Sequence, residues 1–216
     1  MNYYKMYSGS LNPRYLDETV EILRRGGVIL YPTDSFYALG CDALNNRAVE
    51  RVCRLREINP AKQRLSVVCD SISMASDFAS IDNRAFSVLR EGTPGPTTFI
   101  LPASPKLAKA FKGRHEVGVR IPDNPVATGI ARTLGSPLLS ATAVWPELTD
   151  EVDLTDQSAL FCDPEDSPLY PASLPDEVRL HWEQLGVDAL IDAGETPGQP
   201  TRIIGLLDSA NPTQIR

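Results

Sequence analysis

Hydrophobic residues are spaced along this chain in two rhythms, one typical of helices and one typical of strands. Leu16, Val20 and Leu23 lie three or four residues apart, as on one face of a helix, and Gly26 ends that run. Residues 28–31 then form a short, continuous apolar run that is closed by a proline, which is typical of a buried strand. The start of the chain therefore predicts a helix followed by a buried strand.

The same two rhythms continue to the end of the chain. They predict helices at about 13–25, 45–56, 71–78, 82–91, 105–111, 125–134 and 176–185, and strands at about 28–31, 65–69, 99–101, 117–121, 138–142, 188–192 and 202–206. Helices and strands alternate, and this order predicts an α/β fold with a mixed sheet. Because 216 residues fall within the size of one domain, we expect a single domain over 1–216.

Residues 146–177 differ from the rest of the chain. They are rich in Pro, Asp, Glu and Ser and show no sustained period. This composition predicts a long acidic surface loop or insertion. The elements that follow are too few to build a second core, so we do not interpret the segment as a linker between domains.

The net charge of −7 is unevenly distributed. Residues 1–132 hold 18 Lys and Arg against 13 Asp and Glu, whereas residues 133–216 hold 3 against 15. A basic half allows the binding of phosphate or carboxylate, which an evenly acidic protein would disfavour. We therefore expect the first 132 residues to form a cleft for an anionic ligand such as a nucleotide. The alternative is that the charges only solvate both halves.

Several classes of protein find no support in the sequence. No apolar run approaches the ~20 residues that cross a bilayer, and no basic and apolar leader opens the chain, so we expect a cytoplasmic protein without a membrane partner. The histidines form no H-E-x-x-H motif and the cysteines no C-x-x-C pair, so we expect no protein-bound metal. The cysteines are expected to be small core residues: Cys41, Cys53, Cys69 and Cys162.

Three segments place hydroxyl, basic or backbone donor groups beside turn-forming residues at a strand end. They read YPTDSFYALG at 31–40, PGPTT at 94–98 and VGVRIP at 117–122. An arginine at a strand end, with threonine and serine hydroxyls nearby, can bind a carboxylate or phosphate through two parallel hydrogen bonds. Ligands of open α/β sheets bind at that edge, so these segments predict the site.

The order and spacing of the segments resemble the YrdC-like family, the group that includes the threonylcarbamoyl-AMP synthases. In that family a Tyr-Pro-Thr-Asp-Thr strand precedes a helix that ends in Lys-x-Arg. A Pro-Gly-Pro-x-Thr turn, a Val-Arg-Ile-Pro strand and a Ser-x-Asn motif follow. The matching pieces of this chain run from about 13 to 205, and four of them keep the family's order.

The resemblance implies a single-domain twisted sheet with helices on both faces and a concave, basic cleft. It also implies a reaction in which L-threonine, bicarbonate and ATP give L-threonylcarbamoyl-AMP and diphosphate. Mg²⁺ would enter as its ATP complex, with no tightly bound cofactor. The product supplies the N6-threonylcarbamoyl group of tRNA adenosine 37, and the family is associated with binding of double-stranded RNA.

Residue by residue, the resemblance implies that Thr33, Ser35 and Arg120 contact threonine, Ser35 keeping the hydroxyl of the family's threonine. Arg56 and Arg120 are the implied catalytic residues. The implied nucleotide site comprises the matched cations and hydroxyls Arg56, Lys62, Arg64, Thr97, Thr98, Ser140 and Thr142. Asp34 could contact Mg²⁺, act as a base or only shape the turn.

Two positions depart from the synthase pattern. Ile58 stands where the Lys-x-Arg motif has its second cation, and Val144 where the Ser-x-Asn motif has its asparagine. Each lost polar contact to a buried phosphate costs on the order of 1–3 kcal/mol, so two losses could abolish efficient turnover. Lys62 and Arg64 are the cations that could substitute. The YciO branch of the family shows the same departures, and the chain resembles that branch.

Two other hypotheses remain open. One is a nucleotide- or RNA-binding module without catalysis, which needs stacking aromatic side chains or a dense cationic patch. Tyr31, Phe36 and Tyr37 are candidates for stacking unless they belong to the core. The other is an unrelated small-molecule enzyme that uses the same cleft. If threonine changes the affinity of the protein for nucleotide, the synthase is favoured over the binding module. The sequence predicts no oligomeric state.

Overall fold

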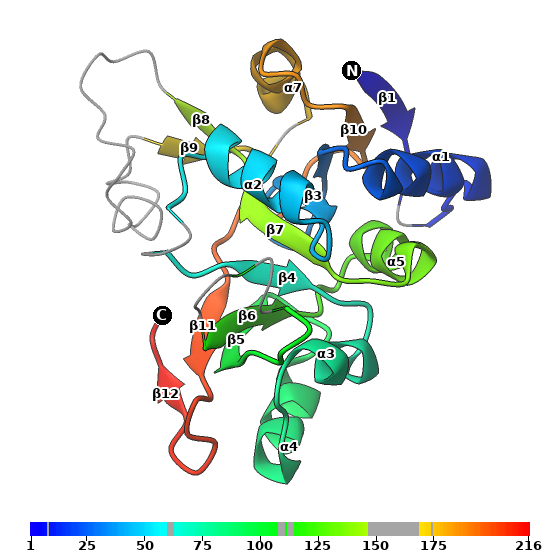
Figure 1. Cartoon of the computed structure of the whole chain (residues 1–216). Coiled ribbons are helices and arrows are strands. Elements are labelled where there is room, and N and C mark those ends of the chain that lie inside the picture. The colour runs from blue at the N-terminus through cyan, green and yellow to red at the C-terminus, as the bar shows by residue number, and fades with distance from the viewer. Residues whose placement is uncertain (8, 60–62, 108–110, 112–114, 147–168, 174) are drawn as a thin grey trace.

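The structure is a computed structural model that describes residues 1–7, 9–59, 63–107, 111, 115–146, 169–173 and 175–216. Ten strands form one sheet (Figure 1), in the order β1 (Asn2–Lys5), β10 (Ala189–Asp192), β2 (Ile29–Tyr31), β3 (Ala38–Asp42), β7 (Leu138–Thr142), β4 (Ser66–Val68), β6 (Glu116–Arg120), β5 (Thr97–Pro102), β11 (Arg202–Gly205) and β12 (Thr213–Gln214). Two further strands, β8 (Val144–Pro146) and β9 (Leu169–Pro171), form a separate antiparallel pair.

Strand directions in the large sheet are mixed. β1, β10 and β2 run parallel to one another, as do β4 with β6 and β5 with β11. β3 and β7, in the middle, are antiparallel to both of their neighbours. The α/β class and the mixed sheet that the sequence predicts are confirmed.

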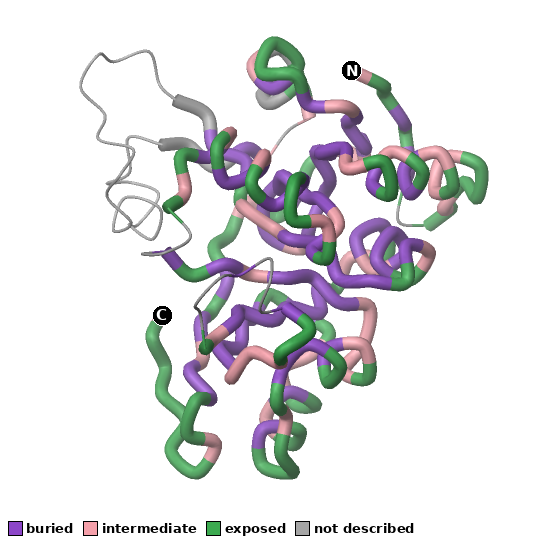
Figure 2. Tube along the Cα trace, in the orientation of Figure 1, coloured by how far each residue is buried: buried purple, intermediate pink, exposed green. Residues whose placement is uncertain are grey.

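Helices cover both faces of this sheet. On one face lie α1 (Pro13–Arg24) and α5 (Pro125–Leu134), and on the other α2 (Asn46–Leu55), α3 (Ile72–Phe78), α4 (Asn83–Gly92) and α7 (Pro175–Gln184). Alternate strand residues divide between the two cores: Ile29 and Leu138 pack under α1 and α5, whereas Leu30 and Leu139 pack under the other helices. The buried strands therefore lie between two helical layers (Figure 2).

The main helices begin at the caps that the sequence indicates. Asn45 accepts a hydrogen bond from the Ala48 N–H at 3.2 Å, and Asp82 accepts one from the Ala85 N–H at 2.8 Å. These bonds satisfy backbone donors that the first turn of a helix leaves free. The predicted starts of α2 and α4 are thus correct to within one residue.

β3 is the central element that the sequence did not predict. Its residues Ala38 to Cys41 are buried whichever face they point to, so they show no alternation of apolar and polar residues. Gly40 is required there because a Cβ at that position would lie 2.6 Å from Tyr31 Cε1. A glycine inside a buried run reads as a loop, although here it makes room for the neighbouring ring.

Other details differ from the prediction. β1 and β12 extend the sheet beyond 13–205. Within 146–177, predicted as a loop or insertion, the structure has β9, and 147–168 lie outside the described residues, whereas α7 begins at Pro175 and agrees with the helix predicted at about 176–185. Of the helix predicted at 105–111, residues 108–110 lie outside the described residues, and 105–107 and 111 are in turns. Leu107 and Phe111 are buried, and the Phe111 N–H donates to the Leu107 carbonyl oxygen at 3.0 Å.

Candidate functional site

The loop after β2 is organised around Thr33, which is 1% exposed. Its hydroxyl donates to the Phe36 carbonyl oxygen at 2.7 Å and accepts from the Ser35 backbone N–H at 3.1 Å. The Ser35 hydroxyl lies 3.1 Å from that of Thr33. This compact hydrogen-bonded turn fixes the position of the Ser35 side chain.

Arg120 reaches this loop from the end of β6. Its Nη2 donates to Asp34 Oδ1 at 2.7 Å and to Ser35 Oγ at 3.3 Å. Arg120 Nε is buried, and no atom in the described part of the chain accepts its hydrogen. A buried donor without an acceptor is costly, and an anionic ligand would satisfy it. Thr33, Ser35 and Arg120, which the resemblance assigns to threonine, therefore lie together.

The sheet face next to Arg120 carries hydroxyl groups. Ser66, Gly118 and Ser140 pair across β4, β6 and β7 and so point to one face. A Cβ at Gly118 would lie 2.3 Å from Ser66 Oγ and 3.1 Å from Thr98 Cγ2, so a glycine is needed to leave room for these two side chains. Ser66 and Ser140 are only half-buried, and solvent therefore reaches this polar row.

Thr201 and Arg216 border the same face. The hydroxyls of Thr98 and Thr201 lie 3.3 Å apart, and Arg216 Nε donates to the Thr201 carbonyl oxygen at 3.1 Å. Burial and the positive charge of Arg120 lower the pKa of Arg216. The two guanidinium groups are therefore within electrostatic reach of each other, and a bound anion would relieve their repulsion.

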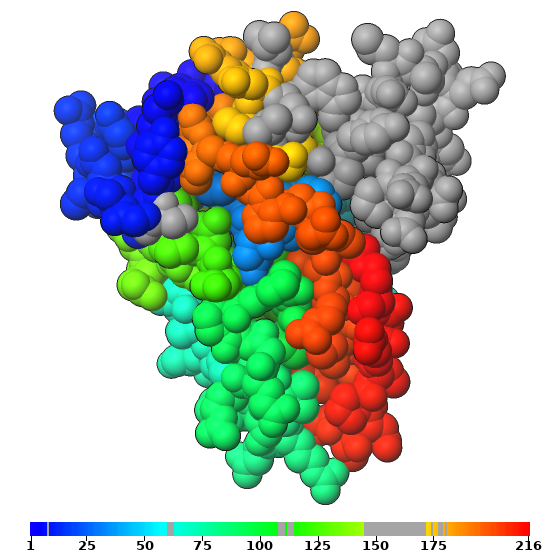
Figure 3. Space-filling model, turned by 180° about the vertical axis from the view of Figure 1, so that it is seen from behind, coloured from blue at the N-terminus to red at the C-terminus, as the bar shows by residue number. Residues whose placement is uncertain are grey.

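The segment between β10 and β11 crosses this side of the molecule, where Figure 3 shows it in orange beside the blue and green segments. The Gly198 N–H donates to the Ser35 carbonyl oxygen at 2.8 Å, and the Arg202 N–H to that of Pro96 at 2.9 Å. The crossing segment thus joins the loop after β2 to the turn before β5. Three segments that are distant in sequence meet at the site.

Other residues that the resemblance assigns to the nucleotide are placed differently. Ser140 accepts from the Tyr31 hydroxyl at 2.8 Å on the polar face, and Thr142 is exposed two residues further along β7. Thr97 points to the opposite face, where Arg202 donates to its hydroxyl at 3.3 Å. Because neighbouring strand residues alternate between faces, only Thr98 of the Thr97-Thr98 pair can join Arg120.

The predicted cations near α2 do not converge on Arg120. Arg56 ends α2 and is 9% exposed, and burial lowers its pKa to about 10. Arg64, which lies two residues before Ser66 along the chain, forms an ion pair with Glu116 at 2.7 Å. Lys62 lies outside the described residues. Within the described ranges, no hydrogen bond or ion pair links Arg56 or Arg64 to the Arg120 group.

The two departures from the synthase pattern are part of the packed interior. Ile58 is partly buried against the main core, and Val144 is 5% exposed. The side chains of Ile58 and Val144 therefore pack inside the protein.

The aromatic residues of the 31–40 segment are buried. Tyr31 and Tyr37 are fully enclosed and Phe36 is 9% exposed. Burial raises the pKa of Tyr31 to about 12. These three side chains therefore belong to the core, and in this structure they do not offer the stacking faces that an RNA-binding module would need.

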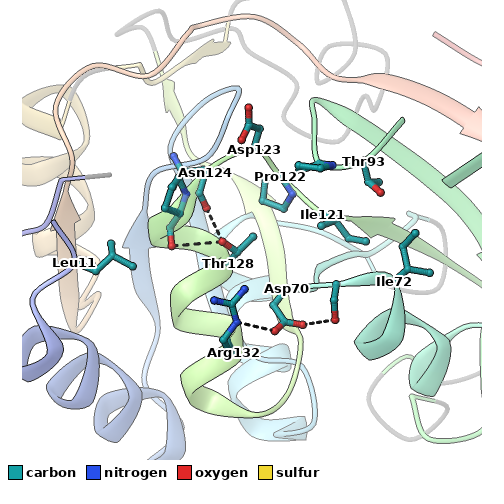
Figure 4. Close-up of a pocket in the computed structure, with 13 residues that line it drawn as sticks. Leu11, Asp70, Ile72, Thr93, Ile121, Pro122, Asp123, Asn124, Thr128 and Arg132 are labelled. Atoms are coloured by element: carbon teal, nitrogen blue, oxygen red, sulfur yellow. Dashed lines mark hydrogen bonds and ion pairs between the residues drawn. The ribbon is translucent and has the colours of Figure 1, made fainter. Parts of the chain in front are cut away.

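A separate pocket of about 470 Å³ lies beyond Arg120, where the chain continues as 121–125. Figure 4 shows Asp123 and Asn124 at one end and the Asp70–Arg132 ion pair at the other, with Leu11 facing Ile121 and Ile72 across the opening. None of Thr33, Ser35 and Arg120 lines it. The pocket shares only the backbone segment that follows Arg120 with the polar site.

Ser66, Thr201 and Arg216 are site residues that the sequence interpretation missed. Each is a single polar residue in or beside an apolar strand, a weak signal on its own. The Gly118 position, inside an otherwise apolar β-run, was the stronger signal, because such a glycine often marks a close approach.

Within the described ranges, no three His, Cys, Asp or Glu residues gather as a metal site would require. No helix of those ranges is long and apolar enough to cross a membrane. Cys41, Cys53 and Cys69 are buried free thiols, as expected, and Cys162 lies outside the described residues.

Comparison with known proteins gives concordant results. The model of the Sua5/yciO/yrdC family, described as "Telomere recombination", matches residues 21–159. YciO of Escherichia coli (strain K12) is 34% identical over 207 residues, which cover 94% of this chain and 88% of YciO. The crystal structure of E. coli YciO superposes with a TM-score of 0.81, at 31% identity, over 100% of this chain and 95% of that one.

Two further proteins match over a smaller part of their own length. The threonylcarbamoyl-AMP synthase of Methylobacillus flagellatus is 36% identical over 123 residues, or 56% of this chain and 68% of that protein. P. abyssi Sua5 complexed with L-threonine superposes with a TM-score of 0.78 over 100% of this chain and 57% of Sua5. Identity to Sua5 is 20%, so this match shows the fold alone. The chain belongs to the Sua5/YciO/YrdC family, in its YciO branch.

Proposed function

We propose that this chain binds L-threonine and ATP at the Arg120 site and forms L-threonylcarbamoyl-AMP. The observation that carries the proposal is the buried group of Thr33, Ser35 and Arg120. The Nε of Arg120 has no acceptor among the described residues. A guanidinium beside fixed hydroxyls matches a ligand that carries both a carboxylate and a hydroxyl group. Relatives named as threonylcarbamoyl-AMP synthases support this substrate class.

The protein would act mainly by positioning the reactants. Bicarbonate carboxylates the threonine amine with loss of water, the carbamate oxygen attacks the α-phosphorus of ATP, and diphosphate leaves. Arg120 would hold the threonine carboxylate, while Arg216 would stabilise charge on the phosphoryl oxygens. The hydroxyls of Ser66, Thr98 and Ser140 lie on the same sheet face as Arg120 and would line the space for threonine and ATP.

Mg²⁺ would enter with ATP, held mainly by the phosphates. Asp34 is the carboxylate nearest to Arg120, and both of its oxygens already accept hydrogen bonds. It therefore fits poorly as a metal ligand. Arg56, Lys62, Arg64 and Thr142 remain proposed nucleotide contacts, and they require the ligand to extend along the polar row away from Arg120.

A second candidate function is binding of nucleotide without synthesis. Ile58 and Val144, packed in the interior where synthases have polar groups, favour it. Binding of double-stranded RNA and a part in tRNA modification are also proposals, and both rest on the family resemblance. For RNA, the burial of Tyr31 and Tyr37 leaves cationic contacts as the means of binding.

Diphosphate release from ATP by the purified protein tests the proposal, with threonine and bicarbonate omitted in turn. Release that needs both establishes the synthase. Calorimetric titration of ATP with and without threonine then separates the alternatives. Tighter ATP binding with threonine, without release of diphosphate, indicates a site that has lost turnover, and ATP binding indifferent to threonine indicates a binding module.

Ser35→Ala sharpens the test because it removes one hydroxyl from the group. We expect threonine affinity to fall by about 5- to 150-fold, corresponding to the loss of one hydrogen bond with its donor left unsatisfied. Ser136→Ala is the matched control, since Ser136 is similarly buried and donates to Asp42 at 2.9 Å, away from the site. Equal effects of the two variants would contradict a direct contact of Ser35 with threonine.

A further inference from the structure

Asp34 is held from two sides. Arg120 Nη2 donates to its Oδ1 at 2.7 Å, and the Asp123 backbone N–H donates to its Oδ2 at 3.0 Å. The side chains of Asp34 and Arg120 are 7% and 9% exposed. The carboxylate therefore links the loop after β2 to the first residues beyond β6, and both of its oxygens are engaged.

This arrangement argues against two other roles for Asp34. A general base must present an oxygen to the substrate proton, and a Mg²⁺ ligand must present one to the ion. Here one oxygen is directed to a guanidinium and the other to a backbone N–H, inside an almost fully buried pair. What Asp34 controls in this structure is the orientation of Arg120.

The same Arg120 nitrogen serves both partners. Nη2 donates to Asp34 and to Ser35, while Nε has no acceptor among the described residues. A planar guanidinium anchored at Nη2 has little freedom to rotate, so the direction of its Nε–H is fixed as well. Preorganised donors of this kind bind a ligand without first having to be ordered.

We infer that Asp34 is a positioning residue, which holds the Arg120 guanidinium in the orientation that binds the carboxylate of the substrate. This inference rests on the proposed function for the identity of that substrate. It makes a prediction opposite to that of simple electrostatics. Removing a negative charge beside an anion site should strengthen anion binding, whereas loss of the anchor should weaken it.

The experiment compares Asp34→Asn with Asp123→Asn. The Asp123 carboxylate is a neighbouring negative charge on an exposed residue, and the hydrogen bond to Asp34 comes from the Asp123 backbone, so this control removes the charge without the anchor. L-threonine binding is measured by calorimetry at two salt concentrations. We expect the dissociation constant of Asp34→Asn to rise at least about ten-fold, and that of Asp123→Asn to stay within about two-fold of wild type.

A second measurement needs no substrate. The Arg120 Nε–H signal, identified by its loss in Arg120→Lys, is followed by NMR for hydrogen exchange and ¹⁵N relaxation. In wild type we expect slow exchange and a rigid N–H vector, and in Asp34→Asn faster exchange and greater mobility. If wild type fails to bind threonine, the proposed function falls, and this measurement still decides the role of Asp34.

Asp34→Glu covers the case in which Asp34→Asn does not fold. It keeps the charge and displaces the carboxylate by one methylene group, so we expect weaker threonine binding in a folded protein and a more mobile Arg120 N–H. Threonine binding as tight as or tighter than wild type in a folded Asp34 variant, or an unchanged Arg120 Nε–H signal, would overturn the inference.

Discussion

Two parts of one sheet face have opposite characters. Under α1 and α5 the face presents Ile29, Leu138 and Val68, all with no measurable exposure. Two residues along the same strands it presents Ser140 and Ser66, both half-buried. The change from apolar to hydroxyl side chains occurs within a single strand, in β7 and again in β4.

The difference shows how one sheet can supply both stability and a site. Strand alternation fixes which residues share the face, but the helix above decides whether an apolar side chain there is buried. Two residues along, hydroxyls and Gly118 replace the apolar residues across β4, β6 and β7, and Arg120 lies beside Val68 at the edge of the apolar part. Variants on either side of this border should therefore affect different properties.

Arg120→Met should have the largest effect. It leaves the Asp34 carboxylate buried without its cation, which costs about 3–5 kcal/mol of unfolding free energy, and threonine binding should be lost. Urea unfolding and calorimetry measure the two effects. Arg132→Met is the control, because Arg132 pairs with Asp70 at 3.1 Å but is 69% exposed, and surface pairs contribute about 0–1 kcal/mol. Similar losses in both variants would contradict a special role for the buried pair.

Leu138→Ala tests the apolar side of the border. Leu138 is fully buried beneath α5, and truncating a buried leucine costs about 2–5 kcal/mol. Below the unfolding transition, we expect the affinity of the folded protein for threonine to remain within about two-fold of wild type. A large change in affinity would show that the two parts of the face are not separable.

The sequence predicted the regular elements well and the site in part. α5 and β7 match the prediction residue for residue, because caps and apolar spacing are local signals. The strand-end motifs predicted that Ser35 and Arg120 lie together. They did not predict that Thr201 and Arg216 lie beside the same site, because that placement depends on the crossing segment at 193–201. Thr97 was assigned with Thr98 because a sequence does not say which of two adjacent residues faces the ligand.

Tyr31 lies on the border itself, with its ring in the apolar core and its hydroxyl donating to Ser140 at 2.8 Å. Burial raises its pKa to about 12, above the value of about 10 in an unfolded chain. Its contribution to stability is therefore fully present below pH ~10 and is lost as the pH rises towards ~12. At pH ~11 the loss amounts to about 1.4 kcal/mol.

Tyr31→Phe should remove the part of the stability loss at alkaline pH that comes from ionisation of Tyr31. Comparing urea unfolding at pH ~9 and ~11, we expect the stability of the variant to fall less than that of wild type, by about 1.4 kcal/mol. Tyr37→Phe serves as a second variant, because burial also raises the pKa of Tyr37, away from the polar row. An unchanged pH dependence in Tyr31→Phe would mean that the Tyr31 hydroxyl titrates as in the unfolded chain.

Ser66→Ala should have the smallest effect on stability and the clearest meaning for the site. Ser66 is half-buried and makes no side-chain hydrogen bond within the described part of the chain, so its hydroxyl contributes little to folding, within about 0.5 kcal/mol. If the polar row contacts the ligand, ATP affinity should fall by about 2- to 12-fold, the range of one hydrogen bond. Ser76→Ala, at an exposed position of α3, is the control. Unchanged affinity in Ser66→Ala would confine the site to Arg120 and its immediate partners, and the hydroxyl side of the border would then be a solvated surface without a ligand.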